Sequence, residues 1–73
     1  MPRLHKKSVT LSGHETSLAL EPPFWAALQA MADAQGQSLA QLIRDLDDGR
    51  GDAPLASACR VSALAWALRR RAE

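Results

Sequence analysis

The chain has 73 residues, 47% of them hydrophobic, with one cysteine and a net charge of +1. This length allows one domain with a small core, and a single cysteine excludes both an internal disulfide and a cysteine-based zinc site. Because so short and apolar a chain has no covalent or metal staple, we expect it to share its core with a second copy.

The small net charge conceals a segregation along the chain. Arg3, Lys6 and Lys7 precede the first acidic residue, arginines occupy positions 69–71, and most of the acids lie between these segments. Basic segments on both sides of an acidic middle suggest that a polyanion meets the terminal segments. Solvated, flexible ends are the plainer alternative.

The sequence carries no pattern of export or membrane insertion. The basic start lacks the apolar stretch of a signal peptide, and no apolar run reaches the roughly 18 residues of a membrane span. We therefore expect a cytoplasmic protein that has no membrane partner.

Residues 1–7 are expected to form a flexible basic arm, and residues 8–73 the folded domain. The alternation in TSLAL predicts a half-buried strand at about residues 15–20. The run SVTL at 8–11 alternates in the same way, and Gly13 allows a bend after it. This run is either an arm that leads into the strand, which we favour, or the first strand of a local hairpin.

Three helices are predicted after the strand, at about 23–35, 38–48 and 55–71. Two prolines fit the first turn of the first helix, because the N–H groups they lack would have no partner there. Ser38 is a preferred N-cap for the second helix. The third helix is apolar on almost every side, so we expect it to be buried on several sides, in part by a second copy.

A single strand needs a partner for its backbone N–H and C=O groups. We expect two copies to pair this strand across a twofold axis as an antiparallel ribbon, with the helices beneath it forming a shared core. The positions that face away from that core are Glu15, Ser17 and Ala19. The side chains predicted to form the dimer core are Leu18, Leu20, Phe24, Trp25, Leu28, Leu42, Ile43, Leu46, Leu64 and Trp66.

The sequence resembles the ribbon-helix-helix family of DNA-binding proteins, which includes MetJ and Arc. The resemblance rests on KKSVTLSGHETSLALEPPFWAAL, GQSLAQLI and LASACRVSAL, which together span about residues 6–64. Within the family, the chain is similar to a small bacterial branch of uncharacterised ribbon-helix-helix domains. The resemblance implies a mostly α fold with one short β-strand, in an intertwined homodimer with an intermolecular antiparallel β-ribbon, to which this chain adds a C-terminal helix.

The resemblance also implies a transcription regulator that binds double-stranded DNA and inserts the ribbon into the major groove. Glu15, Ser17 and Ala19 would then face the bases, although Arg, Lys, Asn and Gln are better base readers. Independently of the resemblance, backbone N–H groups at the start of the second helix can bind a phosphate. The residues expected at DNA phosphates are Arg3, Lys6, Lys7, His14, Gln37, Ser38 and Leu39. Dimers could associate further on the DNA.

The alternative function is a protein-interaction module, such as an antitoxin-like partner with weak or no DNA binding. The acidic middle of the chain, the poor base readers on the strand and the apolar third helix favour it. The two functions predict different partners, a DNA duplex in one case and a protein in the other.

Other residues with chemical potential have plainer interpretations. HETSL begins like a zinc-protease motif, but Leu18 stands where a second histidine is required, so no metal site is expected. We expect no cofactor and no enzymatic activity, because no catalytic constellation is present. Cys59 is expected to be a buried thiol packed as an apolar group. Arg60 is expected to pair with Asp45 or Asp47, or else to project into solvent.

Overall fold

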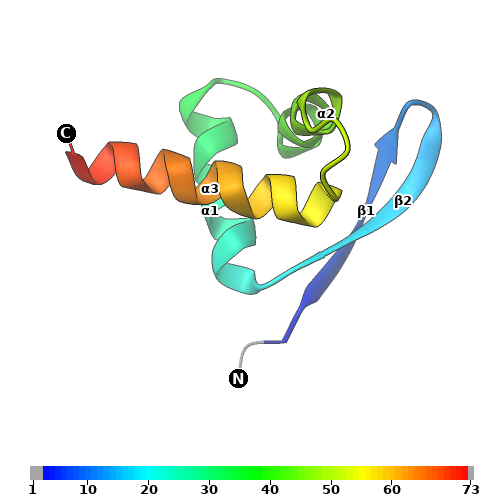
Figure 1. Cartoon of the computed structure of the whole chain (residues 1–73), viewed down its shortest axis with the longest axis horizontal. Helices are drawn as coiled ribbons and strands as arrows, with labels where there is room; N and C mark the ends of the chain where they lie inside the picture. The colour runs from blue at the N-terminus through cyan, green and yellow to red at the C-terminus, as the bar shows by residue number, and fades with distance from the viewer. Residues whose placement is uncertain (1–2, 73) are drawn as a thin grey trace.

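The computed structural model describes residues 3–72, in which a two-stranded hairpin is followed by three helices (Figure 1). The hairpin lies along one side of the helices, and α3 runs across α1. None of the described helices has the length and hydropathy that a membrane span requires. The elements are β1 (His5–Leu11), β2 (His14–Leu20), α1 (Pro22–Ala34), α2 (Leu39–Gly49) and α3 (Leu55–Ala72).

A two-residue turn, Ser12–Gly13, joins β1 to β2. The φ angles of both residues are positive, 51° and 80°, as a type I′ turn requires. This turn type matches the right-handed twist of two antiparallel strands. The register runs from Leu11 opposite His14 to His5 opposite Leu20, so every residue of β2 has a partner in its own chain.

The hairpin corrects four predictions. Residues 5–7, predicted to be part of a flexible arm, belong to β1, and the fold has two strands where one was predicted. The strand predicted at 15–20 pairs with β1 of the same chain and not solely with a second copy. The favoured reading of 8–11 as an arm was wrong, and the hairpin alternative is confirmed.

The physical reason for the error lies in the geometry of the turn. Val9 and Leu11 have odd numbers and Leu18 and Leu20 even ones, which suggested that a bend or bulge was needed to bring them to one face. In a hairpin with this two-residue turn, directly opposite residues share a face, and Val9 lies opposite Thr16. Odd positions of β1 and even positions of β2 therefore face the helices without any bulge.

The core lies between β2 and the three helices. The strands contribute unequally to it, because Leu18 and Leu20 of β2 are buried whereas Val9 and Leu11 of β1 are only half-buried at its margin. The helices supply the other buried apolar residues, which are Trp25, Leu28, Met31, Ala32, Leu42, Ile43, Cys59 and Ala63.

Most side chains predicted for a shared core are covered within the single chain. Phe24, Leu46 and Trp66 are partly buried against the core, and Leu64 is 57% exposed. A role for any of these side chains at a dimer interface remains a prediction. The predicted residues that the chain buries by itself are Leu18, Leu20, Trp25, Leu28, Leu42 and Ile43.

The ends of α1 and α2 follow local rules that can be recognised in the sequence. Gly36, with φ of 68°, ends α1 in a Schellman motif, in which the backbone N–H of Gln37 donates to the carbonyl oxygen of Ala32 at 3.0 Å. Ser38 is the N-cap of α2, as predicted, and its Oγ accepts the backbone N–H of Gln41 at 3.1 Å.

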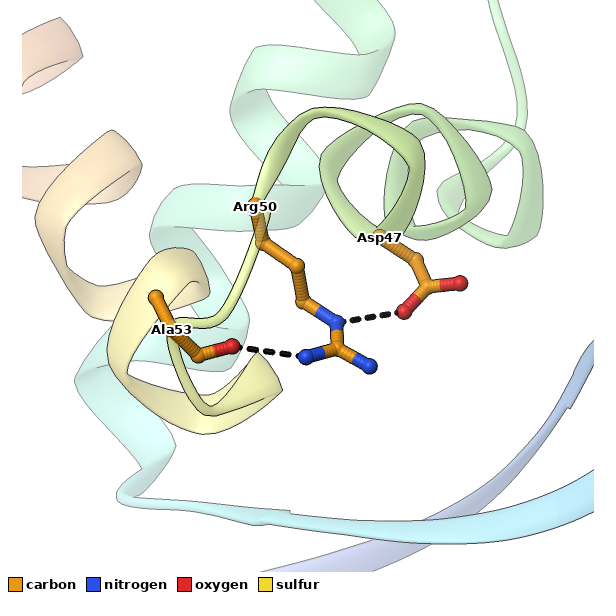
Figure 2. Close-up of polar contacts among 3 residues, drawn as sticks. All are labelled: Asp47, Arg50 and Ala53. Atoms are coloured by element: carbon orange, nitrogen blue, oxygen red, sulfur yellow. Dashed lines mark hydrogen bonds and ion pairs between the residues drawn. The ribbon is translucent and has the colours of Figure 1, made fainter.

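Arg50 joins the end of α2 to the start of α3. Its Nε lies 2.6 Å from Oδ1 of Asp47, and a terminal guanidinium nitrogen donates to the carbonyl oxygen of Ala53 at 2.7 Å (Figure 2). One side chain thus binds both sides of the glycine-containing connection. The charge of Arg50 is paired with Asp47 by this arrangement.

Candidate nucleic-acid interface

The hairpin has one face toward the helices and one face toward solvent. Residues directly opposite each other share a face, and β2 turns Leu18 and Leu20 to the core. The remaining pairs must therefore point away from it. This outward face consists of Lys6, Ser8, Thr10, Glu15, Ser17 and Ala19, all exposed except Ala19, which is half-buried.

Two adjacent lysines fall on opposite faces of the hairpin. Lys6 lies opposite Ala19 on the outward face, whereas Lys7 lies opposite Leu18 on the face toward the helices. The Nζ atom of Lys7 is 4.9 Å from the centre of the Trp25 ring, within the range of a cation–π contact. The amine of Lys7 is therefore directed toward α1 and away from the outward face.

Trp25 also fixes the start of β1. Its indole Nε1 donates a hydrogen bond to the carbonyl oxygen of His5 at 2.7 Å, while its ring is buried in the core. Because His5 lies opposite Leu20 at the end of the hairpin, this contact joins both strands to α1. This contact fixes the position of the hairpin, and with it the outward face, relative to α1.

The structure brings the predicted base-facing residues together with residues that the sequence reasoning missed. Glu15 and Ser17 lie opposite Thr10 and Ser8, neither of which was assigned to the site. A signal was present, since a Ser-Gly pair between two alternating runs is typical of a hairpin turn. Reading that turn would have assigned the whole outward face.

The predicted phosphate residues are spread over several elements. Arg3 precedes β1 and is exposed, and His14 opens β2 beside the turn, opposite Leu11. The structure therefore gathers Lys6 with the base-facing residues but leaves Arg3 and His14 at the two ends of the hairpin.

The start of α2 packs against β1. Some of its hydrogen-bonding groups already have partners within the chain. The backbone N–H of Gln37 is donated to Ala32, and its side-chain amide donates to Oε1 of Gln35 at 2.6 Å. The hydroxyl oxygen of Ser38 caps the helix. Among the described residues no acceptor is found for the backbone N–H of Leu39. The backbone N–H of Ala40 has none either, and both groups lie in the first turn of the helix, where they can donate to an anion.

An ion pair secures the junction between β2 and α1. Nη2 of Arg60 lies 2.8 Å from Oε1 of Glu21, the Nε of Arg60 donates to the same oxygen at 2.9 Å, and the guanidinium stands 5.7 Å from the Phe24 ring centre. The predicted partners, Asp45 and Asp47, were wrong. α3 packs across α1, and Arg60 lies at Glu21 and Phe24, where β2 leads into α1, and not at the acids of α2.

The surroundings of Glu21 and Cys59 shift the pKa values of their side chains. A hydrogen bond from its own backbone N–H, and then the bond from Arg60, lower the pKa of the Glu21 carboxyl. Burial raises the pKa of the Cys59 thiol, which is fully inaccessible to solvent. Cys59 is thus a buried thiol, as predicted, and holds its proton at neutral pH.

Comparison with known proteins supports the architecture. The chain is similar in structure to an uncharacterized protein from Bordetella pertussis Tohama I, with a TM-score of 0.84 and 33% sequence identity. The match covers 93% of this chain and 58% of that one, so the chain spans a little over half the length of its neighbour. None of the curated protein sequences matches it. A family profile described as "Ribbon-helix-helix domain" matches residues 4–67, and the chain therefore belongs to the ribbon-helix-helix domain family.

Proposed function

We propose that the chain binds double-stranded DNA as a homodimer and acts as a transcription regulator, with the outward face of its hairpin against the major groove. The observation that carries this proposal is the outward face itself. It is exposed and mostly polar along its length, while the opposite face of the same hairpin is fixed to an apolar core. Polar side chains at alternate positions of paired strands are what a β-ribbon reader requires.

The free edge of β2 supports a dimer. The Leu11–His14 pair that closes the turn is hydrogen-bonded, and such pairs alternate, so the backbone groups of Ser17 and its outward neighbours point away from β1. Within residues 3–72, nothing pairs with this edge. The corresponding edge of β1 carries Lys6, and lysines on an edge discourage pairing. Two copies therefore join β2 to β2 in antiparallel fashion.

This dimer assigns different contacts to the two strands. Four adjacent strands measure about 14 Å from first to last, which exceeds the roughly 12 Å width of the major groove. The central pair of β2 strands then enters the groove and the β1 strands lie at its margins. Glu15, Ser17 and Ala19 face the bases, where a carboxylate accepts from cytosine, a hydroxyl contacts several bases and a methyl group contacts thymine.

Phosphate contacts come from the flanks. Lys6 at the groove margin and Arg3 before β1 supply positive charge, and His14 lies at the turn end. At the start of α2, the free backbone N–H of Leu39 forms an anion site, to which the hydroxyl hydrogen of Ser38 and the second hydrogen of the Gln37 side-chain amide add donors. Lys7 contributes less, because its amine is held over Trp25.

Selection of bound duplexes from a random pool tests the proposal, with a matched pair of variants. Ser8→Glu places a carboxylate on the outward face, whereas Ala30→Glu adds the same charge at an exposed position of α1. We expect the wild type and Ala30→Glu to enrich a common, twofold-symmetric motif, and Ser8→Glu to enrich none. Equal enrichment by the two variants would place the DNA elsewhere on the molecule.

The second candidate function is a protein-interaction module. The observation that favours it is the composition of the outward face, which holds Glu15 and no arginine, asparagine or glutamine. In that case the wild type shows no retention on duplex DNA at low salt and copurifies with one stoichiometric protein partner. Both results together would show that the chain binds a protein partner and not DNA.

A further inference from the structure

Helix α3 has an apolar face that no described part of the chain covers. Val61, Leu64 and Leu68 are 64%, 57% and 55% exposed, and they account for three of the four large hydrophobic side chains exposed in residues 3–72. The opposite side of α3 buries Cys59 and Ala63 in the core. The helix was predicted to be buried on several sides, and one chain buries only one of them.

The exposed side chains follow the spacing of a coiled-coil seam. Ser57, Val61, Leu64, Leu68 and Arg71 are separated by four, three, four and three residues, and all five are exposed. An average step of 3.5 residues keeps side chains on the line along which two helices pack knobs into holes. We call these five residues the α3 seam.

We propose that the α3 seam binds the α3 seam of a second copy, with the two helices antiparallel about a twofold axis. In the register that packs every apolar seam residue against an uncharged one, Val61 packs on Leu64 of the second copy and Ser57 on Leu68 of the second copy. The seam is then complementary to itself, as a twofold interface requires. This contact is separate from the β2 edge and does not depend on DNA binding.

Charge decides the direction of the two helices. Arginines 69–71 lie at the end of α3, and in a parallel pair the two sets would lie side by side. In the antiparallel register, Arg71 reaches Pro54 of the second copy, beside Asp52, which is exposed. Arg50 does not oppose this approach, because Asp47 already neutralises it (Figure 2).

A cavity beside the seam offers room for an incoming side chain. It has a volume of about 320 Å³, lies between α2 and α3, and has Leu46, Ala58 and Val61 in its wall together with Ser57. In the proposed register, Leu68 of the second copy stands next to Ser57, at this cavity. Burial of that leucine would remove apolar surface from water on both copies.

The inference predicts an assembly larger than the β2-joined dimer. Two different twofold contacts on one chain, one at β2 and one at α3, join four or more copies. Loss of the α3 contact alone lowers the mass at least twofold, whether or not the β2 contact forms. The outcome of the test is therefore independent of the proposed DNA-binding function.

Sedimentation velocity of the whole chain over a range of micromolar concentrations tests the inference. Leu64→Glu is the diagnostic variant, because the side chain is exposed and its replacement leaves the core intact. Ala30→Glu, which adds the same charge on α1, is the control. We expect Leu64→Glu to lower the mass at least twofold and the control to keep it, with unchanged circular dichroism. An unchanged mass for Leu64→Glu overturns the proposal. This holds even if a different protein proves to bind the α3 seam, because the proposed occupant is a second copy of this chain.

A charge exchange tests the antiparallel register. Arg71→Asp and Asp52→Arg should each weaken self-association about fivefold, since each disrupts two symmetric ion pairs. The two substitutions together should restore most of the loss. A double variant no better than the weaker single variant contradicts the register.

Discussion

Lys6 and Lys7 are neighbours in the chain, but the amine of Lys7 lies 4.9 Å from the centre of the Trp25 ring while Lys6 lies on the opposite face of the hairpin. Strand geometry thus divides the basic N-terminal segment between two tasks. One lysine is available to a polyanion, and the other contributes to the contact between β1 and α1.

Single alanine substitutions should separate these tasks. Lys6→Ala should weaken DNA binding and lower the slope of log affinity against log salt by about 1 per copy, with a stability change within about 0.5 kcal/mol. Lys7→Ala should change the slope less and cost about 0.5–1 kcal/mol of unfolding free energy. Salt titrations and urea unfolding of both variants measure this. Equal slopes for the two variants would refute the division.

The turn at Ser12–Gly13 predicts how the hairpin responds to substitution. Ser12→Asn should stabilise the fold by about 0.5 kcal/mol, because asparagine tolerates positive φ better than serine and Asn-Gly is the preferred type I′ pair. Gly13→Ala should destabilise it by about 1 kcal/mol or more. Chemical denaturation gives both values. If Gly13→Ala left the free energy of unfolding unchanged, β1 and β2 would not pair through this turn.

The Arg60–Glu21 pair predicts a pH dependence. The pKa of Glu21 is lower in the folded chain than its ordinary value of 4.5, so its contribution is present above pH 4.5 and is lost as the pH falls through the folded pKa. Wild type should therefore be more stable than Glu21→Gln at neutral pH, and the difference should shrink in acid. Thermal unfolding across this pH range measures it, with Glu15→Gln as an exposed control. A difference independent of pH would exclude the ionised pair as its source.

The core side of β2 should not tolerate charge. Leu20 is fully buried, so Leu20→Ala should cost about 2–5 kcal/mol, and Leu18→Asp or Leu20→Asp should unfold the chain. Ala19→Asp, on the outward face between them, should remain folded. Circular dichroism and nuclear magnetic resonance spectra distinguish these states. A folded Leu20→Asp variant would show that the register of β2 is wrong.

Features that depend on nearby residues could be predicted from the sequence. Three helices with a glycine stop at Gly36 and a serine cap at Ser38 follow from local hydrogen-bonding rules, and the burial of Cys59 follows from its apolar neighbours. The partner of β2 could not be read from alternation, because a pattern of period two shows which face is buried and not which strand lies beside it.

Contacts between residues far apart in the chain could not be predicted from the sequence pattern, for the same reason. Arg60 meets Glu21, 39 residues away, because α3 packs across α1, and no spacing rule encodes that crossing. The outward-facing positions on β2 could be assigned from the alternation of buried and exposed residues alone. Ser8 and Thr10 were missed, because their face depends on the register of the hairpin.

The salt dependence of duplex binding by the wild-type chain tests the central claim most directly. If the outward face of the hairpin meets DNA, log affinity should fall linearly as log salt rises, with a slope of about −0.9 for each phosphate contacted, and Ser8→Glu should abolish the binding. A flat salt dependence, or no binding to any duplex at low salt, would contradict the account.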